Sequence, residues 1–340
     1  KTDRSKGNRS SNSSDPLLGI ANSLAPNNKF EQNEANLESP VDWKRLTVRS
    51  KINNNKNRSK MNEVEQILPN YSYVFDFERS IAYQDILPTI TDHYSTCFYC
   101  SVIYIALIFA GKHYMSSRPR FELRGVLILW NALLASFSIF GFIRMRLELS
   151  FALGHGFYHS ICFNSLAEDR IINFWSLMFI LSKLVEFGDT VFIILRKQPL
   201  MFLHWYHHVT VLLYAWLCFM EATAYSRWNG TINFFIHSWM YSYYTLKAMR
   251  FNPPKWITMT ITTLQIVQMI WGCFITITAY NYARSGECSV TLHNAQIGLL
   301  IYLSYFILFV RFFKQSYLHK KHGKKVNESE KKNGIDHGLK

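Results

Sequence analysis

The chain has 340 residues, of which 49% are hydrophobic, and a formal net charge of +14. Residues 1–60 are rich in Asn, Ser, Lys, Arg and acidic residues, so the remainder is far more apolar than this average and is not typical of a soluble domain. The positive charge lies mainly in the two tails and in short loops, without a base-stacking or helix-turn-helix context, so we expect no nucleic-acid binding.

The N-terminal segment, residues 1–70, is predicted to be disordered, because a segment of low hydrophobicity cannot bury enough apolar surface to fold. Position 1 is not Met, and Met61 in SKMNEVEQ is a candidate natural start, which would make residues 1–60 an extension. We expect no cleavable signal peptide, because the earliest apolar run begins late and is long enough to span a membrane.

Seven apolar runs follow, each close to the roughly 20 residues that a membrane-spanning helix requires. They cover residues 97–115, 125–143, 174–195, 203–221, 231–249, 256–279 and 295–313. The sequence therefore predicts an all-α membrane protein with seven transmembrane helices in residues 71–318, followed by a basic tail in residues 319–340.

The loops between these runs differ in charge on the two sides of the predicted bundle. The more basic side, which also carries the C-terminal tail, has Lys112, Arg118, Arg120, Arg124, Arg196, Lys197, Lys247, Arg250 and Lys255. The opposite side, with longer loops, has Arg144, Arg146, Arg170, Arg227 and Arg284. By the positive-inside rule, the C-terminus lies in the cytosol and the N-terminus on the luminal side. Glycosylation is then expected at the N-terminal sequons of Asn8, Asn12, Asn57 and Asn70.

The fourth apolar run begins with FLHWYHH, in which His204, His207 and His208 lie about one turn from the predicted cytosolic end. Positions i, i+3 and i+4 share a helix face, so the three imidazoles should converge. Polar groups are costly at membrane depth, so this cluster indicates a functional site. The imidazoles could bind a metal, act as base or nucleophile, or form structural hydrogen bonds.

Polar residues at helical spacing occur in three further runs. The run before the histidines contains Lys183, Glu186 and Asp189 at three-residue intervals, for which a buried ion pair that fixes helix packing is the alternative interpretation. The fifth run places Asn233, His237 and Tyr241 on one stripe. The sixth carries Thr262, Gln265 and Gln268, for which hydrogen bonding between helices is an equally good explanation.

Two other classes of membrane protein must be weighed. Histidine boxes occur in di-iron desaturases and hydroxylases, and HGFYH supplies a further pair, His155 and His159. Those enzymes need several boxes and this chain has a single HxxHH, so we rank this alternative second. A seven-span receptor or transporter has no need of a convergent His, Glu, Asp and Lys cluster.

The four motifs resemble those of the ELO family of fatty acid elongases. KLVEFGDT (183–190), HWYHH (204–208), NFFIHSWMYSYY (233–244) and TTLQIVQ (262–268) match the family patterns KxxExxDT, HxxHH, NxxxHxxMYxYY and TxxQxxQ in order. The resemblance covers roughly residues 70–318. Trp205 and the run around it are most similar to the branch that acts on saturated and monounsaturated chains, notably palmitoyl elongase.

The resemblance implies condensation of a long-chain acyl-CoA with malonyl-CoA to a 3-ketoacyl-CoA, CO2 and CoA. It implies residence in the endoplasmic reticulum (ER) membrane, six of the seven helices around an acyl tunnel, no metal and no cofactor besides the co-substrate malonyl-CoA. An acyl-imidazole intermediate is implied on the middle histidine of the box, His207. The ketoreductase, dehydratase and enoyl reductase of the elongation cycle are expected partners, and a homo-oligomer is considered. The implied catalytic residues are His204, His207, His208, His237, Asn233, Lys183, Glu186 and Asp189.

The expected contacts with CoA lie at the cytosolic mouth, where basic side chains suit phosphate groups, although the positive-inside rule alone accounts for them equally well. The candidates are Arg196, Lys197, Tyr241, Tyr244, Lys247, Arg250, Lys255, Gln265 and Gln268. The resemblance also implies a disulfide between Cys162 and Cys288, because similar family members often keep a cysteine in each of these two luminal loops. Two free luminal thiols are the alternative.

Overall fold

The structure is a computed structural model that describes residues 69–286, 288 and 290–318. The predictions of a disordered N-terminal extension and of a basic C-terminal tail fall on residues outside this part of the chain, apart from Pro69 and Asn70.

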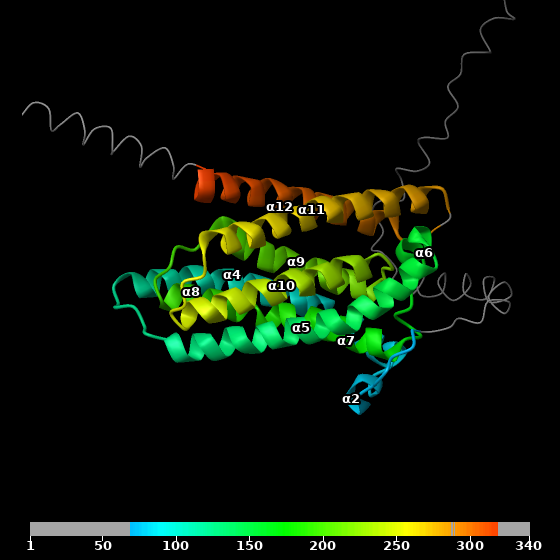
Figure 1. Cartoon of the computed structure of the whole chain (residues 1–340), viewed down its shortest axis with the longest axis horizontal. Coiled ribbons are helices and arrows are strands. Elements are labelled where there is room, and N and C mark those ends of the chain that lie inside the picture. Colours follow the sequence, from blue (N-terminus) through cyan, green and yellow to red (C-terminus); the bar gives the residue numbers. More distant parts are fainter. Residues whose placement is uncertain (1–68, 287, 289, 319–340) are drawn as a thin grey trace, which may run out of the picture. The chain divides into compact units, whose positions relative to one another are not determined.

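All regular secondary structure in the described residues is helical (Figure 1). The elements are α2 (Asp76–Arg79), α3 (Tyr83–Asp92), α4 (Tyr94–Ser116), α5 (Arg124–Gly154), α6 (Phe157–Cys162), α7 (Arg170–Val185), α8 (Phe187–Leu195), α9 (Phe202–Met220), α10 (Ser226–Ala248), α11 (Lys255–Arg284), α12 (Leu292–Phe313) and a π-helix, Lys314–Leu318. Each of the seven predicted runs is helical, with the third divided into α7 and α8. The all-α class is confirmed.

Four described helices are long and apolar enough to cross a membrane by length and composition alone, namely α4, α5, α11 and α12 continued to Leu318. These four confirm a multi-pass membrane protein, whereas the count of seven spans stays a prediction. The other three predicted runs do not reach the helix length or the mean hydropathy of these four. α7 and α8 are each short, and α9 and α10 carry the histidines and other polar side chains, which lower their mean hydropathy.

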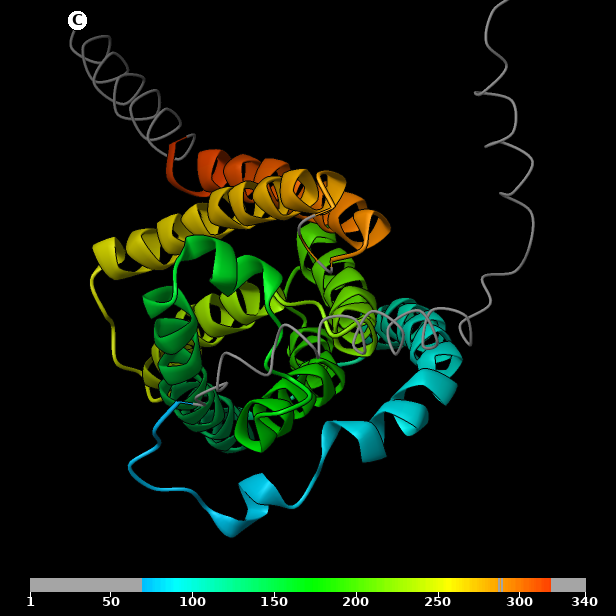
Figure 2. The same ribbon diagram turned by 90° about the vertical axis from the view of Figure 1, so that its right-hand side faces the viewer.

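The long helices pack in a ring that is visible end-on in Figure 2. α5 contacts α7 and α10, α10 contacts α11, α11 contacts α12, α12 contacts α9, and α9 contacts α7, which closes the ring. α8 continues from α7. α4 lies outside the ring, against α8 and α9. A closed ring of helices encloses space along its axis, and the candidate site is found there.

The break between α7 and α8 turns the motif KLVEFGDT toward two different neighbours. Glu186 separates the two helices, and the amide of Asp189 donates to the Glu186 carbonyl at 3.1 Å, a tighter turn than an α-helix. Gly188 follows the break, and a Cβ atom there would lie 2.6 Å from Cζ2 of Trp130. Because glycine has no side chain, the indole of Trp130 in α5 can pack directly on the start of α8.

Several charges that we predicted in luminal loops lie within helices, so that part of the loop analysis is wrong. α5 continues well past the predicted run, and it contains both Arg144 and Arg146. Arg144 Nε donates to Glu78 of α2 at 2.7 Å, while the buried Arg227 of α10 pairs with Glu148 of α5 at 2.7 Å. Buried carboxylates satisfy these arginines, so the helices can extend through sequence that hydropathy alone marks as loop.

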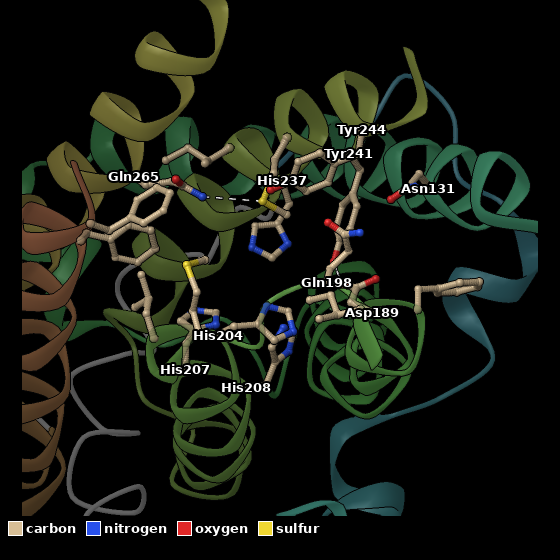
Figure 3. Close-up of a pocket in the computed structure, with 18 of the residues that line it drawn as sticks. Asn131, Asp189, Gln198, His204, His207, His208, His237, Tyr241, Tyr244 and Gln265 are labelled. Atoms are coloured by element: carbon tan, nitrogen blue, oxygen red, sulfur yellow. Dashed lines mark hydrogen bonds between the residues drawn. The ribbon is translucent and has the colours of Figure 1, made fainter. Parts of the chain in front are cut away.

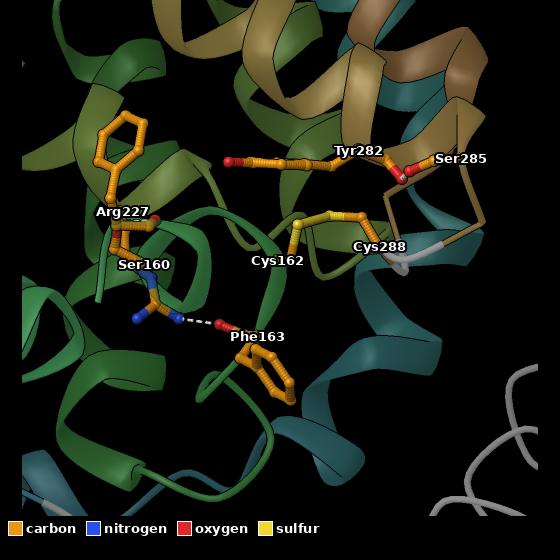
Figure 4. Close-up of a disulfide and its surroundings, with 8 residues drawn as sticks. Ser160, Cys162, Phe163, Arg227, Tyr282, Ser285 and Cys288 are labelled. Atoms are coloured by element: carbon orange, nitrogen blue, oxygen red, sulfur yellow. Dashed lines mark hydrogen bonds between the residues drawn. A yellow bond between two sulfur atoms is a disulfide. The ribbon is translucent and has the colours of Figure 1, made fainter. Parts of the chain in front are cut away.

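The structure contains the expected disulfide between Cys162 and Cys288, with 4.9 Å between the Cα atoms (Figure 4). It joins the end of α6 to the connection between α11 and α12. The bond lies in an apolar cluster that includes Ile161, Tyr225 and Ile275, all fully buried. The bridge therefore ties α6, which follows α5, to the α11–α12 pair at the end of the ring where α10 and α12 begin.

Candidate active site

A cavity of about 580 Å³ lies inside the ring, between α5, α8, α9, α10, α11 and α12 (Figure 3). The predicted site residues that line it are Asp189, Arg196, His204, His207, His208, Asn233, His237, Tyr241, Tyr244, Lys247, Gln265 and Gln268. In Figure 3 the three box histidines of α9 lie on one side, with His237 and Tyr241 of α10 opposite them. The tertiary structure thus brings all four motifs to one cavity.

A second, narrower cavity of about 70 Å³ adjoins the large one. Both are lined by His207, Asn233, Gln268 and Met269, so these residues mark the junction. Apart from these shared residues, the wall of the narrow cavity is mostly apolar surface, with Met145, Leu166, Phe179, Ile180, Val211, Ala215, Cys218 and Phe219 beside the polar Ser176, Ser226 and Asn229. The enclosed space therefore passes from a polar chamber, past the middle histidine of the box, into an apolar extension.

The imidazole ring of His207 makes no hydrogen bond with any described residue. Its backbone carbonyl accepts from the hydroxyls of Thr210 and Tyr305, both at 3.4 Å. The ring packs near the ring of Tyr305, with 4.9 Å between centroids. A neutral imidazole with an unengaged nitrogen facing a cavity is available as a nucleophile or as a base.

The other two box histidines are held more closely. His204 Nε2 lies 2.9 Å from Thr190 Oγ1, and the rings of His204 and His208 are 4.4 Å apart between centroids. His207 and His208 lie 5.6 Å apart by the same measure. The predicted convergence of the three imidazoles is confirmed. Nδ1 of His208 is buried and has no hydrogen-bond partner among the described residues.

Lys183 and Glu186 form a buried ion pair behind the cavity wall, and they do not line the cavity. Lys183 Nζ lies 2.7 Å from Glu186 Oε1 and 3.1 Å from Asn233 Oδ1. An ammonium can only donate, so the Asn233 carbonyl oxygen must face Lys183 and its NH2 group must face away. Glu186 Oε1 also lies 3.8 Å from His237 Nδ1. Lys183 therefore orients the cavity residue Asn233, while the ion pair itself does not reach the cavity.

Asp189 is separated from Glu186 by the helix break and meets different partners. Trp130 Nε1 donates to Asp189 Oδ1 at 2.7 Å, and the Tyr241 hydroxyl donates to Oδ2 at 2.7 Å. Both carboxylate oxygens of Asp189 thus accept a hydrogen bond from a side chain, and the proton of the Tyr241 hydroxyl is donated to Asp189. The expected shared face of Glu186 and Asp189 is not realised, because the break at Glu186 redirects the residues that follow it.

Only two of the five predicted CoA-binding basic residues line the cavity, Arg196 and Lys247. Lys197 instead donates to the backbone carbonyls of Ser116 and Arg118 at 3.1 and 2.9 Å. Lys197 and Arg250 have positive φ values of 54° and 71° just after α8 and α10, where they terminate the helices. For Lys197, Arg250 and Lys255 the structure therefore places no side chain on the cavity wall.

Sequence reasoning missed several residues that complete the site. Asn131 lines the cavity, and its Nδ2 donates to the Leu127 carbonyl at 2.8 Å. Trp130 binds Asp189, and Tyr104 binds Thr190 at 2.7 Å. An amide at membrane depth is a signal that could have marked Asn131. Aromatic residues are too common in membrane helices for Trp130 or Tyr104 to stand out.

The comparison with known proteins agrees with this geometry. The sequence model of the ELO family, described as the GNS1/SUR4 family, matches residues 89–325. The chain belongs to the ELO family. A Very long chain fatty acid elongase 6 from Drosophila melanogaster is 49% identical over 257 residues, which is 74% of this chain and 81% of that protein. A Very long chain fatty acid elongase 3 from Homo sapiens is 41% identical over 260 residues, which is 76% of this chain and 94% of that protein.

Membership of the ELO family leaves the di-iron alternative without support, and the donor geometry agrees. His155 and His159 lie at the corner between α5 and α6, with 5.2 Å between ring centroids, and neither lines the two cavities. His155 Nδ1 is 3.0 Å from the carbonyl oxygen of Phe151. In residues 69–318, as far as they are described, no group of three or more His, Cys, Asp or Glu side chains could hold a metal ion.

Proposed function

We propose that this ELO family protein condenses a long-chain acyl-CoA with malonyl-CoA, giving a 3-ketoacyl-CoA, CO2 and CoA. The observation that carries the proposal is the position of His207, whose unengaged imidazole lies where the polar chamber meets the apolar extension. The relatives' printed names, very long chain fatty acid elongases, support the same reaction class. No resident cofactor is invoked, because loss of CO2 from malonyl-CoA itself supplies the carbon nucleophile for the new carbon-carbon bond.

The two cavities suit the two ends of an acyl-CoA. The thioester would lie at His207, the hydrocarbon chain would extend toward Phe219 and Gly230, and the CoA group would lie toward Arg196 and Lys247. Burial of a hydrocarbon chain in the apolar extension is favourable by roughly 0.8 kcal/mol per CH2 group. Guanidinium and ammonium groups at the mouth would contact the phosphates.

The chemistry divides into two steps. An imidazole nitrogen of His207 attacks the thioester carbonyl, a C–N bond forms, the C–S bond breaks, and the thiolate of CoA leaves and takes up a proton from solvent, while the acylated ring keeps the proton on its other nitrogen. Malonyl-CoA then loses CO2, and the electron pair of the broken C–C bond becomes an enolate. The enolate carbon attacks the acyl carbonyl, the C–N bond to His207 breaks, and the neutral imidazole is regenerated. The Asn233 NH2 group, which faces away from Lys183, would be a hydrogen-bond donor for the developing oxyanions, and His237 lines the same cavity.

The proposal extends to topology and location. The ring elements would form six spans around the tunnel and α4 the seventh, with the mouth at Arg196 and Lys247 in the cytosol and the disulfide in the ER lumen. The N-terminal segment would then be luminal and glycosylated. The ketoreductase, dehydratase and enoyl reductase that act on the product remain expected partners, and a homo-oligomer stays an open alternative.

The decisive experiment incubates the purified protein with malonyl-CoA labelled in its free carboxyl group and with saturated and monounsaturated acyl-CoAs of increasing length. We expect labelled CO2 whose release depends on the acyl-CoA, together with a 3-ketoacyl-CoA longer by two carbons. Absence of both products with every acyl-CoA, under conditions in which the Drosophila relative is active, would contradict the proposal.

A further inference from the structure

A chain of three side chains leads from the outer helix α4 to the histidine box. Tyr104 of α4 is buried, and its ring stacks on Phe187 of α8 with 4.0 Å between centroids. Its hydroxyl lies 2.7 Å from Thr190 Oγ1, and Thr190 Oγ1 lies 2.9 Å from His204 Nε2. Thr190 is completely buried, so no solvent reaches the middle of this chain. Besides the packing of Phe109 on Trp205, with 5.9 Å between ring centroids, the outer helix thus reaches a box histidine through the hydroxyl group of Thr190.

The direction of these hydrogen bonds follows from counting donors and acceptors. Among the described residues, the Tyr104 hydroxyl has no partner except Thr190, and the Thr190 hydroxyl has no partner except Tyr104 and His204. If Thr190 donated to Tyr104, the Tyr104 proton would be buried without an acceptor. If Thr190 accepted from both neighbours, its own proton would be unpaired. Both arrangements carry the cost of an unsatisfied buried donor.

One arrangement satisfies every group: Tyr104 donates to Thr190, and Thr190 donates to His204 Nε2. A neutral imidazole has one donor and one acceptor nitrogen, so the proton of His204 must then be on Nδ1. No described residue hydrogen-bonds to His204 Nδ1, and His204 lines the cavity. This nitrogen is therefore the donor that His204 can offer to a ligand.

We infer that Tyr104 is a positioning residue for the reaction: it donates to Thr190 and so orients the Thr190 hydroxyl, which donates to His204 Nε2 and keeps the His204 proton on Nδ1. The inference rests on the proposed condensation for its catalytic consequence. A fixed Nδ1–H suits the negative charge that develops on the thioester carbonyl oxygen or on the enolate oxygen. In this assignment α4, which does not belong to the ring, contributes to the chemistry without touching the substrate.

Tyr104→Phe tests this role, because it removes the hydroxyl and keeps the ring that stacks on Phe187. We expect kcat to fall about tenfold, the size of one lost directing hydrogen bond, with the KM for acyl-CoA unchanged. Thr190→Val should cause a similar fall, whereas Thr190→Ser, which retains the hydroxyl, should stay close to the wild type. Tyr99→Phe, at an exposed position of the same helix, is the matched control and should leave kcat unchanged.

A double-mutant cycle separates positioning from general stability. If Tyr104 acts through Thr190, Tyr104→Phe should lower kcat no further in the Thr190→Val protein. Equal losses in both backgrounds would overturn the inference, as would a wild-type kcat in Tyr104→Phe.

The tautomer itself is measurable without any turnover. In protein labelled with 15N-histidine, the His204 signals, assigned by their loss in His204→Gln, should show Nδ1 protonated and Nε2 unprotonated. In Thr190→Val, which removes the donor to Nε2, the Nε2–H form should appear. A wild-type His204 already protonated on Nε2 would refute the inference. A protein that shows the expected tautomer yet condenses nothing would refute only the proposed function.

Discussion

Lys183 Nζ lies 3.1 Å from Asn233 Oδ1, across 50 residues of sequence, and so joins the first of the four motifs to the third. The same ammonium is 2.7 Å from Glu186 Oε1, and it lies over the ring of Phe179 at 4.4 Å. One buried cation thus neutralises Glu186 of its own motif and orients the amide of Asn233, in the third motif, toward the cavity. The ion pair that sequence analysis left as a packing alternative is also the support of the site.

Removing one member of this pair should be far more damaging than removing both. Lys183→Met leaves the Glu186 carboxylate buried and unpaired, and we expect a loss of about 3–5 kcal/mol in the free energy of unfolding. The double variant Lys183→Met with Glu186→Met should recover most of that stability but little condensation activity, because Asn233 is no longer oriented. Thermal unfolding in detergent, measured beside the CO2-release assay, checks this. Equal stability of the single and double variants would contradict it.

His207→Ala should abolish condensation while the protein remains folded. The wild-type protein, incubated with acyl-CoA alone, should release CoA and carry an acyl group on a box histidine, detectable by mass spectrometry of its peptides. The control is His155→Ala, which alters a histidine outside both cavities and should retain activity. Normal turnover by His207→Ala would exclude His207 as nucleophile, and CoA release only after malonyl-CoA is added would favour direct condensation.

The two basic residues on the cavity wall should affect substrate binding more than basic residues elsewhere at the mouth. Arg196→Ala and Lys247→Ala should each raise the KM for acyl-CoA about tenfold, with a smaller effect at high salt, because exposed charge contacts are screened. Lys255→Ala should leave the KM unchanged, since Lys255 does not line the cavity. A similar rise in KM for all three variants would contradict this, because CoA would then also contact residues outside the cavity wall.

Loss of the Cys162–Cys288 disulfide should lower stability without abolishing the chemistry. The bond joins residues 126 positions apart in sequence. In the chain-entropy model, closing a loop of this length stabilises the folded protein by about 4–5 kcal/mol. We expect Cys162→Ser to unfold at a clearly lower temperature than wild type. Cys100→Ser, which alters a free cysteine, should unfold at the same temperature as wild type. Non-reducing peptide mapping gives the direct test, since a Cys162 peptide that runs free of Cys288 would rule the bridge out.

The buried carboxyl group of Glu78 should make the free energy of unfolding decrease as the pH falls into the acid range. Burial alone would raise the pKa of its carboxyl group, but hydrogen bonds from Arg144, Trp175 and the Phe75 amide lower the pKa below its ordinary value of 4.5. A carboxyl group with a lowered pKa contributes stability above its unfolded pKa and loses it as the pH falls through the folded value. Wild type should therefore be more stable than Glu78→Gln at pH 7, and the difference should shrink below about pH 4.5. A difference that stays constant down to pH 3 would contradict this.

The sequence alone determined the helical class, the positions of the helices and the faces of the motifs. Those properties depend on neighbours within about one helical turn: an apolar run of sufficient length, or an i, i+3, i+4 spacing that places His204, His207 and His208 together. The order of the four motifs was enough to indicate the ELO family. The same local reasoning could not detect that α5 extends through Arg144, because the carboxylate that satisfies Arg144 is on Glu78, 66 residues away.

Only the tertiary structure decided which polar residues face the cavity and which support it from behind. Lys183 and Asp189 belong to one motif, yet the break at Glu186 sends the first toward Asn233 and the second toward Trp130 and Tyr241. Tyr104 carries no local signal, and its role depends on a hydroxyl that is 86 positions away in sequence. Hydrogen bonds inside a helical bundle connect side chains of different helices, and their partners are fixed by how the ring closes rather than by the pattern of any one helix.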